Sequence, residues 1–253
     1  MKANKDLVYA QIFDDKECVV VMTEEGKKCN FLQFLHNTSN FTWKEEKADK
    51  TIKSDLLRIN DRHLLSKLCA IGYLLQPIKD KLTRRAVIAV DKCSAEGGTG
   101  KSLFGQILRQ AIASSVMSGR HKLFEDNFRW HPVTEETKLV CIEDLPESDF
   151  TYLLDNITGS WTIHSPMKKS FNIHYPKSPR IFITSKSKYK YKEEDYTCCS
   201  WYLYFSDYYG RHHSPEQDFG LMVEQWDDTQ WILFNRLLIE CMKLYTEFGY
   251  IEA

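Results

Sequence analysis

Hydrophobic and polar positions along the chain form two kinds of pattern, which are short apolar runs and stretches compatible with helices. Mainly apolar runs of strand length, which are typical of strands buried on both faces, occur at 86–90, 138–142, 180–184 and 201–205. Stretches compatible with helices occur at 101–117, 149–157 and 227–248. Because strands alternate with helices, the pattern predicts an α/β fold with a mainly parallel sheet and a C-terminal helix.

The N-terminal residues show a separate pattern. Segments 8–13 and 18–22 have the length and composition of strands, and 31–35 is a mixed apolar segment. We therefore expect a small N-terminal α/β appendage over residues 1–50 and one main domain over residues 51–253.

Residues 44–77 connect these two regions. The charged stretch 44–53 lacks apolar periodicity and is expected to be a linker or the exposed start of a helix. Apolar positions between Leu56 and Leu75 then favour a pair of helices, interrupted at Asn60-Asp61 and ended before Pro77.

Composition narrows the class of protein. With 43% hydrophobic and 27% charged residues among 253, the chain is expected to be a soluble globular protein that buries a core. A formal net charge of −1 gives no global field for nucleic acid, so any basic patch must be local. No stretch has the apolar length of a membrane span, and the N-terminus lacks the apolar core of a signal peptide. We therefore expect no membrane partner.

The eight cysteines include the adjacent pair Cys198 and Cys199 but no C-x-x-C pair. Thiols scattered through apolar runs are typical of reduced, mostly buried cysteines in a cytosolic compartment. Their spacing does not favour a zinc site.

The most informative motif follows the strand at 86–90. Residues 94–102 read Ser-Ala-Glu-Gly-Gly-Thr-Gly-Lys-Ser, and a strand, a glycine-rich loop and a helix in this order are typical of a phosphate-binding P-loop. Glycines let backbone N–H groups close around phosphate oxygens, Lys101 would reach the β- and γ-phosphates, and the Ser102 hydroxyl would ligate Mg²⁺. The predicted ATP-binding residues are Glu96, Gly97, Gly98, Thr99, Gly100, Lys101, Ser102 and Leu103.

This motif departs from the usual pattern at one position. Ala95 stands where glycine is common, and Gly97 and Gly98 would supply the missing flexibility. The alternative interpretation is an ordinary glycine-rich turn before a helix.

An apolar strand that ends in two acids is a second pattern typical of nucleotide-binding proteins. Residues 139–142 run directly into Glu143 and Asp144, as in a Walker B element. One carboxylate can hold Mg²⁺ while the other polarises the attacking water, and the two acids are expected to share these roles in either order. Lys101 completes the predicted catalytic set, and Ser102, Glu143 and Asp144 are the predicted Mg²⁺ ligands. Without the P-loop, such a strand end would more simply begin a solvated loop.

Further segments match the ordered blocks of a known family. They are 68–75, 97–104, 133–137, 157–159, 177–184, 205–209, 213–215, 218–220 and 225–227. In order and spacing they resemble superfamily 3 helicases, most closely the helicase domain of phage-type and Bacteroidetes-type primase–helicase proteins. The resemblance covers about residues 64–250.

The resemblance implies an AAA+-like P-loop NTPase that forms a homo-oligomeric ring around single-stranded DNA, with ATP bound between neighbouring subunits. It implies a helicase of phage or mobile-element DNA replication that uses ATP and Mg²⁺. It also implies a primase or an intact helicase as a candidate partner, in the cytoplasm of a bacterium or a phage-infected bacterial cell.

Two groups of lysines are candidates for nucleic-acid contact. A predicted hairpin of 161–165 and 170–175 carries Lys168 and Lys169 at its tip, where the family's hairpin would grip phosphates and where a plain solvated turn is the alternative. Lysines at 186, 188, 190 and 192 alternate with Tyr189 and Tyr191, a pattern suited to phosphate contact and base stacking or to a flexible solvated loop. The predicted nucleic-acid residues are Lys168, Lys169, Lys188 and Lys190.

Two departures from the family pattern leave the activity open. Lys186 stands where the family carries an Asn that orients the attacking water, and 197–201 replaces an arginine-rich run. An arginine that completes a neighbour's site can be worth on the order of 10³–10⁵ in rate. The chain is therefore an active ATPase, or a catalytically weakened ATP- and DNA-binding scaffold, loader or inhibitor that co-assembles with an intact helicase. A small-molecule P-loop kinase fits less well, because no arginine-rich lid segment is evident.

Overall fold

The computed structural model describes residues 6–14, 17–41, 50–92, 97–120, 127–166, 168–190, 194–220 and 222–253. The chain divides into two compact parts. The helical part comprises Met1–Leu75, Asp91–Gly100 and Leu203–Ala253. The sheet part comprises Gln76–Val90 and Lys101–Tyr202. The boundary expected at residue 50 stays a prediction.

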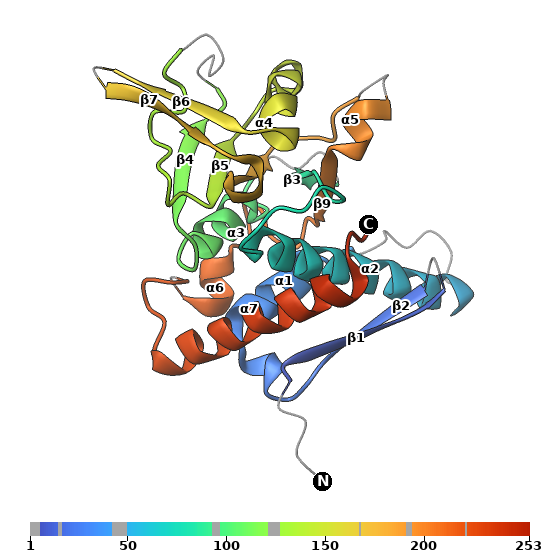
Figure 1. Cartoon of the computed structure of the whole chain (residues 1–253). Helices are drawn as coiled ribbons and strands as arrows, with labels where there is room; N and C mark the ends of the chain where they lie inside the picture. Colours follow the sequence, from blue (N-terminus) through green and yellow to red (C-terminus); the bar gives the residue numbers. More distant parts are fainter. Residues whose placement is uncertain are drawn as a thin grey trace. The chain divides into compact units, whose positions relative to one another are not determined.

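A five-stranded sheet in the order β4-β5-β8-β3-β9 organises the sheet part (Figure 1). Its strands are β3 (Ala86–Asp91), β4 (Ser114–Ser118), β5 (Leu139–Glu143), β8 (Arg180–Thr184) and β9 (Ser200–Phe205). The pairs β4–β5, β5–β8 and β3–β8 are parallel. All residues of β3 and β8 are buried, which explains why both strands appear in the sequence as continuous apolar runs. The expected α/β fold with a mainly parallel sheet is confirmed.

Strand β8 lies between β5 and β3 although it follows both of them along the chain. The register aligns Met117, Ile142, Ile183 and Ile88 in one row across four strands. Because these strands are parallel, the carboxyl ends of β5, β8 and β3 lie at the same edge of the sheet. This is the edge at which open α/β sheets bind ligands.

Short helices and a hairpin complete the sheet part. They are α3 (Lys101–Leu108), a 3₁₀ helix η3 (Glu147–Leu153), α4 (Leu154–Thr158), β6 (Trp161–Ser165), β7 (Lys168–Ile173), η4 (Tyr175–Lys177) and α5 (Glu194–Cys198). The expected hairpin is confirmed, since β6 pairs antiparallel with β7. Trp161 anchors it, because its buried indole N–H donates to the Asn156 carbonyl at 2.7 Å and its ring centroid lies 4.6 Å from that of Trp130.

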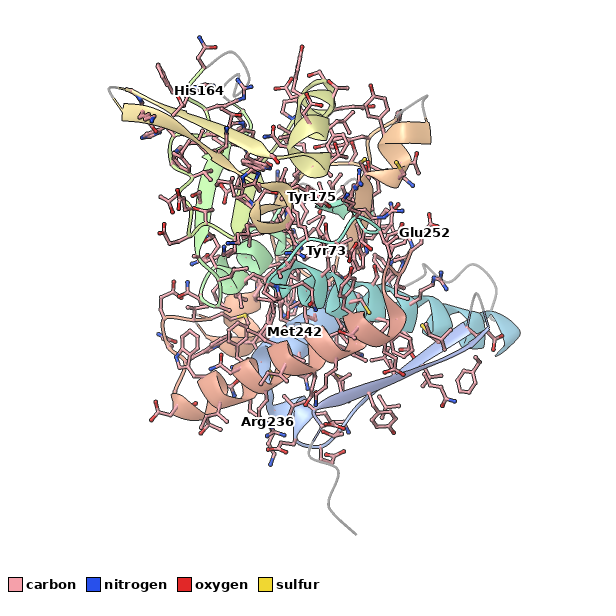
Figure 2. The ribbon with its side chains drawn as sticks, viewed as in Figure 1. Tyr73, His164, Tyr175, Arg236, Met242 and Glu252 are labelled. Atoms are coloured by element: carbon pink, nitrogen blue, oxygen red, sulfur yellow. The ribbon has the colours of Figure 1, made fainter. Side chains whose placement is uncertain are left out.

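The helical part contains a hairpin and the long helices. Its elements are β1 (Val8–Asp14), β2 (Glu17–Met22), a 3₁₀ helix η1 (Gly26–Lys28), α1 (Asn30–Asn37), α2 (Lys50–Leu75), α6 (Pro215–Phe219) and α7 (Asp228–Phe248). Both expected N-terminal strands and the C-terminal helix are confirmed. Asp227 caps α7 by accepting the Gln230 N–H at 2.8 Å. Tyr73 of α2, labelled in Figure 2, has its ring centroid 5.5 Å from that of Tyr245 on α7.

One buried acid fixes the start of β1 to α7. The Glu240 carboxylate accepts the Leu7 N–H at 2.9 Å and the Val8 N–H at 3.0 Å. Burial raises the pKa of Glu240, and these two backbone donors act in the opposite direction.

The helix expected over 101–117 is wrong in its second half. Helix α3 ends at Leu108, and Ser114–Ser118 forms the edge strand β4, which pairs with β5. Ser115 and Met117 of this strand are buried while Val116 is exposed, an alternation with a period of two that marks an edge strand. Pairing with β5 therefore decides a conformation that local propensity leaves open.

The interruption expected at Asn60-Asp61 is also wrong, since α2 runs unbroken from Lys50 to Leu75. The two side chains bond outside the helix instead of competing with its backbone. Asn60 accepts the Phe41 N–H at 3.1 Å, and Asp61 accepts the Val20 N–H at 3.1 Å. Within the described ranges, none of the helices combines the length with the apolar character that a membrane crossing requires.

Candidate functional site

The glycine-rich segment leaves β3 and belongs to the helical part. Gly97, Gly98 and Gly100 have φ angles of 96°, 82° and 96°, which L side chains rarely adopt. The buried Thr99 hydroxyl between them donates to Asp91 Oδ1 at 2.6 Å. The last residue of β3 therefore anchors a loop whose described glycines all have positive φ. Glu96 and Ala95 lie outside the described residues.

Two neighbours within the helical part pack against this segment. A Cβ added at Gly100 would lie 2.7 Å from the Phe34 ring, so a side chain would need space that the ring occupies. A Cβ at Gly98 would lie 3.5 Å from the Gly210 backbone. The segment is thus tied to the end of β3 through Thr99 and has Phe34 and Gly210 as close neighbours.

The remaining predicted ATP-binding residues begin α3 in the sheet part. Lys101 and Leu103 are half-buried and Ser102 is exposed. The N–H groups of a first helical turn have no acceptor within the helix and favour an anion. Phe104 fixes the helix to the sheet, since its ring centroid lies 5.3 Å from that of Phe182 on β8.

The two predicted acids end β5. Glu143 is exposed and is the last residue of the strand, opposite Ser118 of β4. Asp144 follows with a φ of 53° and turns the chain away from the sheet. Its N–H donates to the buried Thr184 hydroxyl at 2.9 Å, and the Leu145 N–H donates to the Thr184 carbonyl at 3.1 Å. The end of β8 therefore holds Asp144 in a left-handed conformation, which aspartate tolerates better than most residues.

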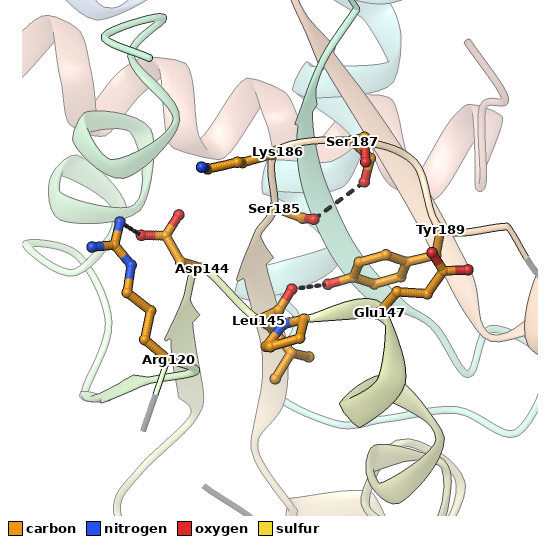
Figure 3. A pocket seen from close by; sticks show the side chains of 9 residues that line it. Arg120, Asp144, Leu145, Glu147, Ser185, Lys186, Ser187 and Tyr189 are labelled. Carbon is orange, nitrogen blue, oxygen red and sulfur yellow. Dashed lines mark hydrogen bonds and ion pairs between the residues drawn. The ribbon is translucent and has the colours of Figure 1, made fainter. Parts of the chain in front are cut away.

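A pocket of about 310 Å³ opens beside Asp144 (Figure 3). It is lined by Arg120, Asp144, Leu145, Pro146, Glu147, Ser185, Lys186, Ser187 and Tyr189. The Asp144 carboxylate forms an ion pair with the exposed Arg120 guanidinium. In Figure 3 the Lys186 ammonium points toward the side of the pocket where this pair lies. The pocket thus combines two carboxylates, those of Asp144 and Glu147, with the two cations Arg120 and Lys186, so the charges of its lining balance.

Tyr189 is buried, so its ring is not exposed for base stacking, which was one of the two alternatives for this lysine-rich segment. The side chain is 5% exposed, and its hydroxyl donates to the Leu145 carbonyl at 2.8 Å. Burial raises the pKa of this phenol. Its ring is a wall of the pocket, because hydrophobic burial outweighs the polar character of the flanking residues. Tyr191 and Lys192 lie outside the described residues.

The predicted nucleic-acid residues occupy two elements. Lys168 and Lys169 are the first residues of β7 and not part of the turn, since Lys168 pairs with Ser165. Lys169, Lys188 and Lys190 are exposed. The Lys188 ammonium lies 5.2 Å from the centroid of the Tyr202 ring.

Sequence reasoning missed three residues that organise the site: Asp91, Arg120 and Thr184. Asp91 could have been found, because it directly follows the buried strand that enters the glycine-rich loop. Arg120 and Thr184 carry no local signal, since their partner Asp144 is 24 and 40 positions away.

No protein-family model and no curated protein matches the chain. Two solved structures of the NrS-1 C-terminal region, both described as A-form and without ligand, are similar to the chain. Each is 14% identical, with TM-scores of 0.46 and 0.45, and the alignment covers 88% of this chain and 45% of that one. The chain therefore spans less than half the length of these structures.

Proposed function

We propose that the chain is an AAA+-like, superfamily 3 helicase-like ATPase that binds ATP·Mg²⁺ and acts on single-stranded DNA in phage or mobile-element replication. The observation that carries the proposal is the conformation of the glycine-rich segment. Gly97, Gly98 and Gly100 all have positive φ immediately before Lys101 and Ser102 begin α3. Successive backbone N–H groups in such a loop can converge on phosphate oxygens.

In this proposal, Lys101 neutralises the β- and γ-phosphates and the Ser102 hydroxyl ligates Mg²⁺. Glu143 and Asp144 share the second half of the chemistry: one carboxylate holds Mg²⁺ and the other accepts a proton from the attacking water. Their place at the carboxyl edge of a parallel sheet supports these roles.

Two groups of lysines would contact the DNA backbone. Lys168 and Lys169 at the β6–β7 hairpin, and Lys188 and Lys190 beyond β8, would neutralise phosphates without reading bases. Affinity should therefore fall with salt and depend little on sequence. The ring of identical subunits, and a primase or intact helicase as partner, belong to the same proposal and would be detected by light scattering and co-purification.

The test measures ATP binding and phosphate release with and without single-stranded DNA. Lys101→Ala should abolish turnover and weaken ATP binding, because the variant loses the charge next to the phosphates. Lys243→Ala is the matched control, since Lys243 is exposed on α7. Unchanged turnover in Lys101→Ala would rule out the glycine-rich segment as the ATP site.

A catalytically weakened scaffold, loader or inhibitor is the second candidate, and the pocket supports it. Asp144 is engaged by Arg120, and Lys186 stands where a neutral Asn would orient water. Both cations compete with Mg²⁺ for the carboxylate. ATP binding without DNA-stimulated phosphate release would favour this candidate. A gain of ATP turnover in Lys186→Asn would then identify Lys186 as the reason for the slow hydrolysis. Fast release by the unmodified chain would exclude it.

A further inference from the structure

The adjacent cysteines Cys198 and Cys199 form a dithiol between α5 and β9. Their sulfur atoms lie 3.8 Å apart. Cys198 is the last residue of α5 and is exposed, while Cys199 is 7% exposed and is the single residue before β9 begins at Ser200. Because the chain leaves the helix between them, the two side chains meet instead of diverging.

The backbone around the pair is held in place by four hydrogen bonds. Arg85 donates to the carbonyl of Thr197 at 2.9 Å and to that of Ser200 at 2.7 Å. The Ala86 N–H donates to the Cys199 carbonyl at 2.8 Å, and the Ser200 hydroxyl donates to the Tyr196 carbonyl at 2.8 Å. The backbone that carries the two thiols is therefore tied to Arg85 and to the start of β3.

The other described cysteines are poor competitors for a thiol-seeking ligand. Cys18, Cys29, Cys69, Cys141 and Cys241 are all buried. Burial raises the pKa of Cys18 and of Cys29 to about 11, and that of Cys141 to about 12. These thiols remain protonated near neutral pH, and none of them, unlike Cys199, is adjacent in the chain to an exposed cysteine. Among the seven cysteines that the structure describes, Cys198 is the exposed one.

We propose that Cys198 and Cys199 form a chelating site for a soft, thiophilic metal or metalloid centre. Zinc-like ions bind thiolates at about 2.3 Å, and two such bonds at roughly 110° span about 3.8 Å. This span equals the observed 3.8 Å between the sulfurs. A disulfide would instead need the sulfurs at about 2.05 Å, which is well below their observed separation of 3.8 Å.

The ligand class follows from the donor set. Two sulfurs suit a soft centre such as Cd²⁺ or trivalent arsenic. No cluster of three or more metal-ligating side chains occurs in the described part of the chain, so the remaining positions on the centre would be filled by water or an external thiol. With phenylarsine oxide, two As–S bonds form, and the arsenic-bound oxygen leaves as water with the two thiol protons. The oxidation state of arsenic does not change.

The test treats the full chain with phenylarsine oxide and measures intact mass after a wash with excess monothiol. The chain and its Cys93→Ser variant should keep one adduct, which a small dithiol removes. Cys198→Ser and Cys199→Ser should each lose the adduct in the same wash, because one sulfur cannot form a chelate. Cys93→Ser is the matched control, since it also removes one thiol but leaves both Cys198 and Cys199 in place.

A second measurement covers the case in which a serine variant fails to fold. Phenylarsine oxide should protect the peptide that holds Cys198 and Cys199 from alkylation in the unmodified chain, and Cd²⁺ should do the same. An unmodified chain that takes no adduct, or a single-cysteine variant that retains it through the wash, would overturn the proposal. The proposal is independent of the proposed ATP site, so either can fail alone.

Discussion

Gly100→Ala is expected to cost more stability than Gly97→Ala, although the two glycines share a φ of 96°. A Cβ at Gly97 would meet nothing within 4 Å, whereas a Cβ at Gly100 would lie 2.7 Å from the Phe34 ring. The pair of variants therefore separates backbone strain from steric overlap in one loop.

The magnitude follows from these two contributions. A strained backbone conformation costs about 1–3 kcal/mol and applies to both variants. Overpacking adds about 1–3 kcal/mol at Gly100 alone. Phe34 cannot easily move aside, because it is fully buried and its ring centroid lies 6.1 Å from that of Phe31 and 5.9 Å from that of Tyr209. The free energy of unfolding should thus fall by roughly 2–6 kcal/mol for Gly100→Ala.

Urea unfolding without nucleotide measures both variants against the unmodified chain. Replacing the ring with a smaller side chain, as in Phe34→Leu with Gly100→Ala, should recover part of the extra loss, because the overlap is removed. Equal losses for Gly97→Ala and Gly100→Ala would refute the packing of the loop against Phe34.

Three further predictions concern the framework around the site. Burial lowers the pKa of Lys79 to about 7. Above that pH the unfolded chain binds more protons than the folded chain, because Lys79 keeps its ordinary pKa only when unfolded. The free energy of unfolding should therefore rise between pH 7 and about 8.5, by up to about 1.4 kcal/mol per pH unit. Urea unfolding midpoints measured at both pH values should rise less in Lys79→Met than in the unmodified chain. An equal rise in the two proteins would contradict the assignment of this pH dependence to Lys79. Thr184→Val removes the acceptor of the Asp144 N–H and should lower the free energy of unfolding by about 1–3 kcal/mol, whereas Thr184→Ser should retain the hydrogen bond. Equal melting temperatures of the two variants would count against the role of Thr184 as this acceptor. Glu240→Leu should speed hydrogen exchange at the Leu7 amide, because its acceptor is lost, and unchanged protection would disprove that anchor.

The strands were predictable because burial on both faces leaves a continuous apolar run. The runs at β3, β5 and β8 have this character, and each matches a strand within one residue. The edge strand β4 was not predictable in this way, since only Ser115 and Met117 of it are buried. Its conformation depends on pairing with β5, which lies about twenty positions further along the chain.

The candidate site also has a part that the sequence predicts and a part that depends on the tertiary structure. The glycine-rich motif and the acids at 143 and 144 are local patterns, and the sequence alone identifies them. The contacts of the Asp144 side chain and backbone are not local, because β8 must enter between β5 and β3 before Thr184 can reach Asp144.

The sequence by itself determined the class of fold, the order of most elements and the place of the glycine-rich motif, because periodicity and glycine content act over a few residues. Only the tertiary structure decided that Thr99 is tied to Asp91, that Asp144 is paired with Arg120, and that Tyr189 is a wall and not a stacking surface. Each of these depends on strand register and burial, which bring together residues that no local pattern connects.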